Sequence, residues 1–214
     1  MTPPWVPDRP LKIGAMASNL TAEVASAAAR LIVDEGMEYG PAKRRAAQQL
    51  GRGRARAADL PDNQAVEDEV RAYIELFCAD TQPAELRALR QVAVQWMERL
   101  QAFRPHLTGA VWRGTATRLS SVHLQLFCDD AKEAEIALLN WRIDFDIHGI
   151  DGPRGERIDV LTVSSPSSEL GEEVTVHLSI LDFDDLRGGM KPDPRGRSER
   201  GDLPRLLQLM AASA

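Results

Sequence analysis

The stretch Ser121-Val-His-Leu-Gln-Leu-Phe127 decides the fold of this chain, because its apolar and polar residues alternate one by one. Successive side chains of a β-strand point to opposite faces of the sheet. One face therefore carries Val122, Leu124 and Leu126, and the other carries Ser121, His123 and Gln125. A strand with this pattern has one face against a hydrophobic core and the other open to solvent or to a cleft.

Three downstream segments repeat this alternation and extend the predicted sheet. They cover residues 142–148, 157–163 and 173–181. We expect Ile158 and Val160 to face the core and Asp159 to lie on the polar face, together with His148 and His177. Short helices are expected over residues 132–140 and 203–210.

The first half of the chain has helical periodicity instead. Apolar residues recur three and four positions apart in the segments 22–35, 41–50, 62–77 and 83–104, with glycine, proline or capping residues between them. We therefore predict an α+β protein, in which an N-terminal helical bundle precedes a small mixed β-sheet with one polar face.

Proline and glycine divide the chain into four parts. Four prolines among the first ten residues predict a flexible lead over residues 1–17, and Met16 is an alternative translation start. The helical region is expected over residues 18–105 and the sheet region over residues 106–186. The last part, residues 187–214, begins with a Gly-, Pro- and Arg-rich stretch that predicts a flexible basic loop before the final helix.

The composition is that of an ordinary globular protein. The chain has 214 residues, a net charge of −6, 43% hydrophobic and 27% charged residues. No apolar run is long enough to span a bilayer, so we expect no membrane association. Cys78 and Cys128 both directly follow the dipeptide Leu-Phe and so lie in apolar surroundings. This context indicates buried thiols in a reducing cytoplasm.

The residues before the first strand form a series that is typical of one enzyme superfamily. Gly109-Ala-Val-Trp-Arg-Gly114 is followed by Ser120, directly before the alternating segment. This series resembles the signature of the DNA polymerase beta-like nucleotidyltransferases, in which Gly-Ser and then Arg-Gly precede a strand carrying Ser-Asp-hydrophobic-Asp. A third carboxylate follows on a later strand. The resemblance covers about residues 107–182 and implies a nucleotidyltransferase-like sheet, with Ala110 in place of the serine.

The resemblance also implies that the metal site of the family is degenerate here. Ser121 and His123 occupy the positions of the two strand carboxylates, and Asp159 corresponds to the third. Nucleotidyl transfer uses Mg²⁺ ions between the attacking and leaving oxygens, and Mg²⁺ prefers carboxylate ligands, which serine and histidine replace poorly. We therefore expect Ser121, His123 and Asp159 to be vestigial, to share one cleft on the polar face and to hold no metal or other cofactor.

The glycines and the arginine of the motif remain as predicted ligand-binding residues. Gly109, Arg113 and Gly114 would surround a phosphate, which the Arg113 guanidinium can bind with two parallel hydrogen bonds. In the alternative interpretation, the two glycines only mark a turn between a helix and a strand. The chain has no Gly-Lys pair for a P-loop and no Gly-x-Ser-x-Gly elbow for a serine hydrolase.

Three functions are compatible with these residues. The favoured one is a non-catalytic nucleotide- or nucleic-acid-binding or regulatory protein of the bacterial cytoplasm. The second is an active nucleotidyltransferase that uses Asp159 with unconventional metal ligands. The third is a structural or protein-interaction module, with a protein partner or a second copy of the chain. Because the strand carboxylates are replaced, we expect the protein not to be an enzyme.

Two further groups of residues are candidate sites. His123, Asp159 and His177 could form a transition-metal site of two histidines and one carboxylate if their strands are neighbours. A basic segment without acidic residues could follow the phosphates of RNA or DNA, dock an acidic surface or form a solvated face. Its residues are Lys43, Arg44, Arg45, Arg52, Arg54 and Arg56.

Overall fold

The computed structural model describes residues 13–51, 60–130, 132–152, 155–187 and 198–212. The chain divides into two compact units, one ending at Tyr73 and the other beginning at Ile74. Within the described residues, no helix has both the length and the apolar character that crossing a membrane requires.

The first unit is built from helices with small buried side chains. It contains α1 (Ile13–Glu35), α2 (Tyr39–Gln49) and most of α3 (Asn63–Phe77), within which the boundary between the units falls. Ala28 and Ala46 are completely buried, and such small residues allow two helix backbones to approach closely. The Tyr73 hydroxyl donates a hydrogen bond to the carboxylate of Asp34 at 2.9 Å and so links α3 to α1.

The start of α1 differs from the expected flexible lead. Residues 13–17 belong to this helix, whereas the rest of the predicted lead, residues 1–12, lies outside the described residues. The four prolines end at Pro10, so nothing in the sequence opposes a helix from Ile13 onward.

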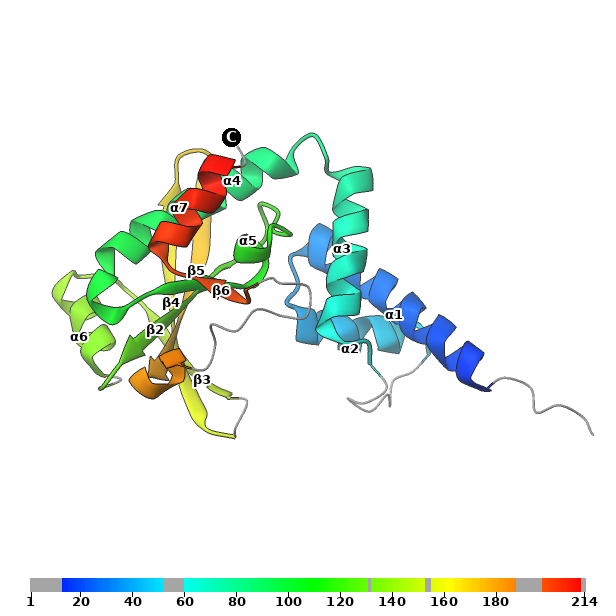
Figure 1. Cartoon of the computed structure of the whole chain (residues 1–214), viewed down its shortest axis with the longest axis horizontal. Helices are drawn as coiled ribbons and strands as arrows, with labels where there is room; N and C mark the ends of the chain where they lie inside the picture. The colour runs from blue at the N-terminus through cyan, green and yellow to red at the C-terminus, as the bar shows by residue number, and fades with distance from the viewer. Residues whose placement is uncertain (1–12, 52–59, 131, 153–154, 188–197, 213–214) are drawn as a thin grey trace, which may run out of the picture. The chain divides into compact units, whose positions relative to one another are not determined.

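The second unit contains a mixed sheet with helices, as the sequence predicts, but the sheet has six strands where the sequence predicts four (Figure 1). Its elements are α4 (Gln82–Arg99), η2 (Gln101–Phe103), β1 (His106–Thr108), α5 (Gly109–Arg113), β2 (Val122–Cys128), α6 (Lys132–Asn140), β3 (Asp146–Asp151), β4 (Arg157–Ser167), β5 (Glu172–Asp182), η3 (Phe183–Arg187), β6 (Arg200–Gly201) and α7 (Leu203–Ala212). The strand order is β3-β4-β5-β2-β1-β6. Only β2 and β5 are parallel; the other neighbouring strands of this sheet are antiparallel. The α+β class is therefore confirmed.

Two adjacent rows of paired residues show how the four central strands separate their faces. The leucine row consists of Leu107, Leu124, Leu178 and Leu161, which are all completely buried. The polar row consists of Thr108, His123, His177 and Thr162, which are all half-buried. Because the rows are one position apart along each strand, they lie on opposite faces of the sheet.

The face of the leucine row is covered by helices (Figure 1). Met97 of α4, Leu138 of α6 and Leu206 of α7 belong to the same buried core as this row. Helix α4 therefore belongs to the unit of the sheet, whereas the sequence analysis groups it with the N-terminal helices in residues 18–105. Helical periodicity reveals that α4 has an apolar face, but it does not reveal which surface covers that face.

The strands agree with the sequence in the centre of the sheet and differ at its edges. β1 and β6 have three and two residues, which is too short for a period to be detected. The first edge strand, β3, begins at Asp146 instead of residue 142. Arg142 adopts a left-handed conformation with φ of 56°, which ends the turn after α6 before the strand can start.

The prediction of buried thiols is confirmed for Cys128, whereas Cys78 is only half-buried. Cys128 is buried at the end of β2, and burial raises the pKa of its thiol to about 11. The thiolate is the nucleophilic form of cysteine. Cys128 is therefore a packing residue with low reactivity at neutral pH.

His106 of β1 is buried against Phe127 of β2. The two rings meet edge to face with centroids 5.3 Å apart, and the His106 Nδ1 lies 2.9 Å from the carbonyl oxygen of Arg104. Burial lowers the pKa of His106 below its ordinary value. The neutral imidazole is therefore the form that the fold favours.

We expect this histidine to make the protein less stable in mild acid. The unfolded chain takes up the proton near pH 6.5, whereas the folded chain takes it up only at lower pH. The contribution is complete above pH 6.5 and is lost as the pH falls from there toward the pKa of the folded state. Urea unfolding at pH 8.0 and pH 5.5 should show a smaller pH dependence in His106→Gln than in the original chain. His148→Gln, at an exposed position, is the control, and an unchanged pH dependence in His106→Gln would contradict the prediction.

Candidate functional site

The polar row and its neighbours bring three histidines close together on one face of the sheet. The fourth, His106, lies two residues before Thr108 on the same face but is buried. His123 of β2 and His177 of β5 are directly paired, and their rings are 4.9 Å apart with 30° between their planes. His148 of β3 lies edge-on to His177, with ring centroids 6.1 Å apart. The Thr162 hydroxyl and the His177 Nδ1 are 3.0 Å apart and share a hydrogen bond. The result is a group of imidazoles and hydroxyls that can both donate and accept hydrogen bonds.

Gly109 connects β1 to α5 directly beside this group. Its φ is 73°, a left-handed conformation that glycine adopts at little cost. A Cβ at this position would lie 3.4 Å from the Cδ2 atom of His123. Glycine therefore allows the main chain to turn alongside the imidazole, and the structure brings Gly109 and His123 together.

The other residues of the motif lie around the ends of α5 and β2. Ser121 is half-buried and immediately precedes β2, and Arg113 is half-buried in the last turn of α5. Gly114 ends α5 with φ of 82°, and its carbonyl oxygen accepts a hydrogen bond from the side-chain amide of Gln82 on α4 at 3.2 Å. Gly109 thus lies beside the polar row, whereas Gly114 contacts the helix that covers the leucine row.

The expectation that Asp159 shares a cleft with Ser121 and His123 is wrong. Thr162 pairs with His177, so Asp159, three residues earlier on β4, lies on the opposite face of the sheet. The apolar neighbours of Asp159 caused the error. Ile158 and Val160 are buried, but the pairing of Val160 with Ser179 places both of them on the face of the histidines.

His177 is the residue that the structure places directly beside His123. Side chains share one ion only if they lie on the same face of neighbouring strands. The strand next to β2 on the side away from β1 is β5, and its residue paired with His123 is His177. Alternation in residues 173–181 predicts the face of His177, but the order of the strands is needed to place it beside His123.

The residues of this surface do not fit Mg²⁺. Mg²⁺ takes oxygen ligands in octahedral geometry, whereas the centre of the polar row offers two imidazoles. In the described part of the chain, no group of three His, Cys, Asp or Glu side chains could hold a metal ion. The alternative site of His123, Asp159 and His177 is also wrong, because Asp159 lies on the other face.

Arg200 of β6 pairs with Thr108 at the end of the polar row and lies on the same face of the sheet. It is only 6% exposed. Its Nη1 donates to the side-chain oxygen of Gln125 at 2.9 Å, and its Nη2 donates to the carbonyl oxygen of Asp185 at 3.0 Å. The guanidinium also stacks over the ring of Phe127, 4.7 Å from the centroid. Arg200 thereby fixes η3 against the end of β2. This role could not be predicted from the sequence, because Arg200 belongs to an arginine-rich stretch in which no single residue stands out.

The basic segment is partly occupied by contacts within the first unit. The Lys43 ammonium donates to the side-chain oxygen of Asn63 at 2.8 Å and to the carbonyl oxygen of Pro61 at 3.1 Å, and burial lowers its pKa. Arg45 forms an ion pair with Glu35. Arg44 is exposed, and Arg52, Arg54 and Arg56 lie outside the described residues.

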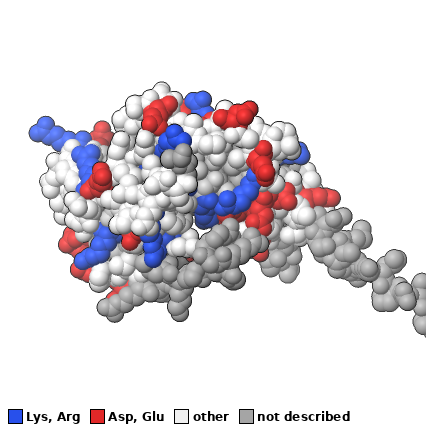
Figure 2. Space-filling model, turned by 45° about the horizontal axis from the view of Figure 1, so that its top comes forward, with Lys and Arg blue, Asp and Glu red and all other residues white. Residues whose placement is uncertain are grey.

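Basic and acidic side chains are interspersed on the face of the molecule that Figure 2 presents. An extended surface of one sign is the electrostatic feature that nucleic-acid binding requires. The described residues on this face therefore give the nucleic-acid interpretation no additional support.

Comparison with known proteins gives few matches. No protein-family model matches the chain, and no curated protein matches it. Among solved structures, it is similar to Cid1 in complex with the UTP analog UMPNPP, with 14% identity and a TM-score of 0.33 over 53% of this chain and 36% of that chain. It is also similar to the Cid1 poly(U) polymerase with MgGTP bound, with 13% identity and a TM-score of 0.32 over 53% of this chain and 38% of that chain. The match thus spans less than two fifths of either Cid1 chain.

Proposed function

We propose that this chain binds a nucleotide on the polar face of its sheet and does not catalyse Mg²⁺-dependent nucleotidyl transfer. The observation that carries the proposal is the pairing of His123 with His177 on neighbouring parallel strands. Both side chains are imidazoles, whereas the Mg²⁺ ions of this reaction are held by carboxylates.

The chemistry of the polar face supports a nucleotide as the ligand. Imidazole rings can stack on a base, and their N–H groups can donate to phosphate oxygens. The His123 and His177 rings are half-buried and close together, so one ligand can contact both. The main chain at Gly109 runs directly beside His123, so its peptide groups lie next to the paired imidazoles.

Binding can be tested without any metal ion. Titration calorimetry with ATP, GTP, CTP and UTP in the presence of EDTA should detect binding of at least one nucleotide. His123→Ala and His177→Ala should each weaken this binding about tenfold or more, which corresponds to about 1.4 kcal/mol. Thr175→Ala, on the same strand and face as His177, is the control and should leave the affinity unchanged. Equal affinities in all four proteins would contradict the proposed site.

The absence of catalysis requires a separate experiment. The chain should transfer no label from any nucleoside triphosphate to RNA or protein in the presence of Mg²⁺ or Mn²⁺, because each missing metal contact costs several kcal/mol of barrier. Transfer that disappears in His123→Ala would show that the protein is an enzyme. In the converse experiment, the double variant His123→Asp, His177→Asp should gain Mg²⁺ binding, whereas Ser121→Asp alone should not.

A further inference from the structure

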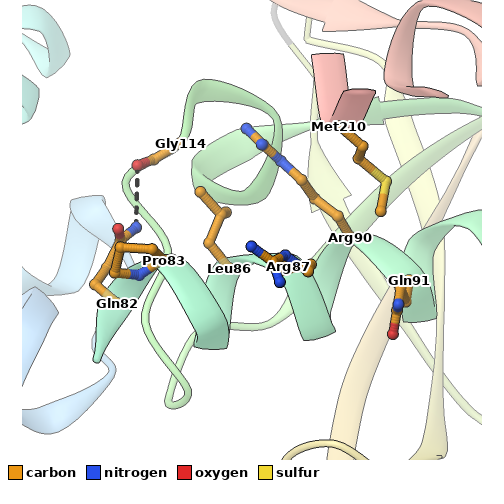
Figure 3. A pocket seen from close by; sticks show the side chains of 8 residues that line it. All are labelled: Gln82, Pro83, Leu86, Arg87, Arg90, Gln91, Gly114 and Met210. Atoms are coloured by element: carbon orange, nitrogen blue, oxygen red, sulfur yellow. Dashed lines mark hydrogen bonds between the residues drawn. The ribbon is translucent and has the colours of Figure 1, made fainter. Parts of the chain in front are cut away.

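The second unit contains a cavity on the helix-covered side of its sheet, away from the polar row. It has a volume of about 570 Å³ and lies between α4, the end of α5 and the end of α7 (Figure 3). Pro83 and Leu86 of α4 and Met210 of α7 provide apolar walls. Gln82, Arg90 and Gly114 provide polar groups. Small-molecule sites are typically cavities of this size, with mostly apolar walls and a few polar groups.

Arg90 is the unusual member of this lining. It is 6% exposed, although arginine is almost never buried without a partner of opposite charge. Its Nε donates to the carbonyl oxygen of Val111 at 3.3 Å. Among the described residues this is the only hydrogen bond of the Arg90 side chain, and no described carboxylate forms an ion pair with it. A guanidinium has five N–H donors, so most of its hydrogen-bonding capacity is unused.

The electrostatic surroundings of Arg90 agree with this contact pattern. Burial lowers the pKa of Arg90, and no acidic side chain in the described segments raises it. A buried charge without a counter-charge destabilises a fold, whereas a bidentate anion would satisfy both the charge and the donors.

We propose that this cavity binds a small organic anion, with a carboxylate or phosphate head on Arg90 and an apolar body against Leu86 and Met210. The main chain at Gly114 lies beside the guanidinium, since a Cβ there would be in van der Waals contact with the Arg90 Nη2 at 3.6 Å. Arg87, exposed at the rim of the cavity, adds a second positive charge that attracts anions. The proposal is independent of the nucleotide site, which lies on the other face of the sheet.

Three probes separate the charge of the ligand from its apolar body. Octanoate and hexyl phosphate each combine an anionic head with an apolar chain, and octanol has the same chain as octanoate without the charge. Calorimetry at fixed ionic strength should show that both anions bind and that octanol binds at least tenfold more weakly than octanoate. Equal binding of octanoate and octanol, or no binding of either anion at millimolar concentration, would overturn the proposal.

A matched pair of arginine variants then tests the residue. Arg90→Met keeps the length of the side chain without its charge, and it should weaken octanoate binding at least tenfold while the melting temperature stays equal or rises. Arg99→Met, on the same helix but outside the cavity, should leave binding unchanged. Octanoate binding by Arg90→Met as strong as that of the original chain would overturn the proposal.

A second variant covers the case in which Arg90→Met does not fold. Met210→Glu places a carboxylate in the cavity wall, where it would compete with the ligand for Arg90. It should abolish octanoate binding, and retention of binding in this variant would count against the proposal.

Discussion

Leu124→Ala is expected to lower the free energy of unfolding by about 2–5 kcal/mol, because it removes a completely buried side chain from the central strand of the sheet. Leu124 is paired with Leu107 on one side and Leu178 on the other. Main-chain hydrogen bonds hold both neighbouring strands in place, so the surroundings have little freedom to fill the cavity left behind. The cost therefore includes both the lost burial and the unfilled cavity.

Urea or guanidinium unfolding of the second unit, followed by tryptophan fluorescence, would measure this loss. Leu207→Ala on α7 is the matched control, since that side chain is 47% exposed. The same exchange there should change the free energy of unfolding by about 0.5 kcal/mol or less. Similar losses in the two variants would mean that the leucine row is not the centre of the core.

Gly201→Ala should destabilise the protein by roughly 1–3 kcal/mol through overpacking. A Cβ at this position would overlap the ring of Trp112, with only 2.7 Å to its Cζ2 atom. The ring has little freedom to move away, because its Nε1 donates a hydrogen bond to the carbonyl oxygen of Ser198 at 2.7 Å. Accommodating the methyl group would break this bond and loosen the attachment of β6 to β1.

A double-mutant cycle isolates this contact. In the background Trp112→Leu, the additional exchange Gly201→Ala should cost much less than in the original chain, because the overlapping ring is absent. The same melting-temperature loss in both backgrounds would contradict the overlap with Trp112. Gly40→Ala is a useful comparison, since a Cβ there meets its nearest neighbour, the Arg44 Nη1, at an ordinary 3.5 Å.

The centre of the sheet could be predicted from the sequence because two independent signals agree there. The alternation in residues 121–127 predicts both the buried face with Leu124 and the open face with His123, and the structure has both. In the alternative interpretation, Gly109 and Gly114 mark a turn before this strand, whereas in the structure they bound the short helix α5 between β1 and β2. Both signals act over a few residues, which is the range over which sequence dictates conformation.

The position of Asp159 could not be predicted by the same reasoning. Alternation assigns a residue to one of two faces only when one face is apolar and the other polar. In β4, Ile158 and Val160 are buried on one face, and Leu161 and Val163 are buried on the other. Both faces of β4 are therefore apolar within the six residues 158–163. The pairing with β5 is needed to decide on which face Asp159 lies.

Arg90 illustrates a second limit of sequence reasoning. It follows Leu89 on α4 and has the sequence character of a solvent-exposed helical residue. Its burial depends on α5 and α7, which are distant in sequence and adjacent in space. A cavity formed by three separate segments leaves no pattern in any one of them.

The parallel pair of β2 and β5 also has a consequence for the order of folding. Val122 pairs with Val176, so the contact at the centre of the sheet joins segments more than fifty residues apart, whereas β3, β4 and β5 are connected by short hairpins. Closing a long loop costs more chain entropy than closing a hairpin, so contacts of high sequence separation form late. We therefore expect the hairpins to form first and the two central strands to meet near the end of folding. His123 and His177 become neighbours only in that last step, and partly folded chains will lack the proposed nucleotide site even where most of their strands are already paired.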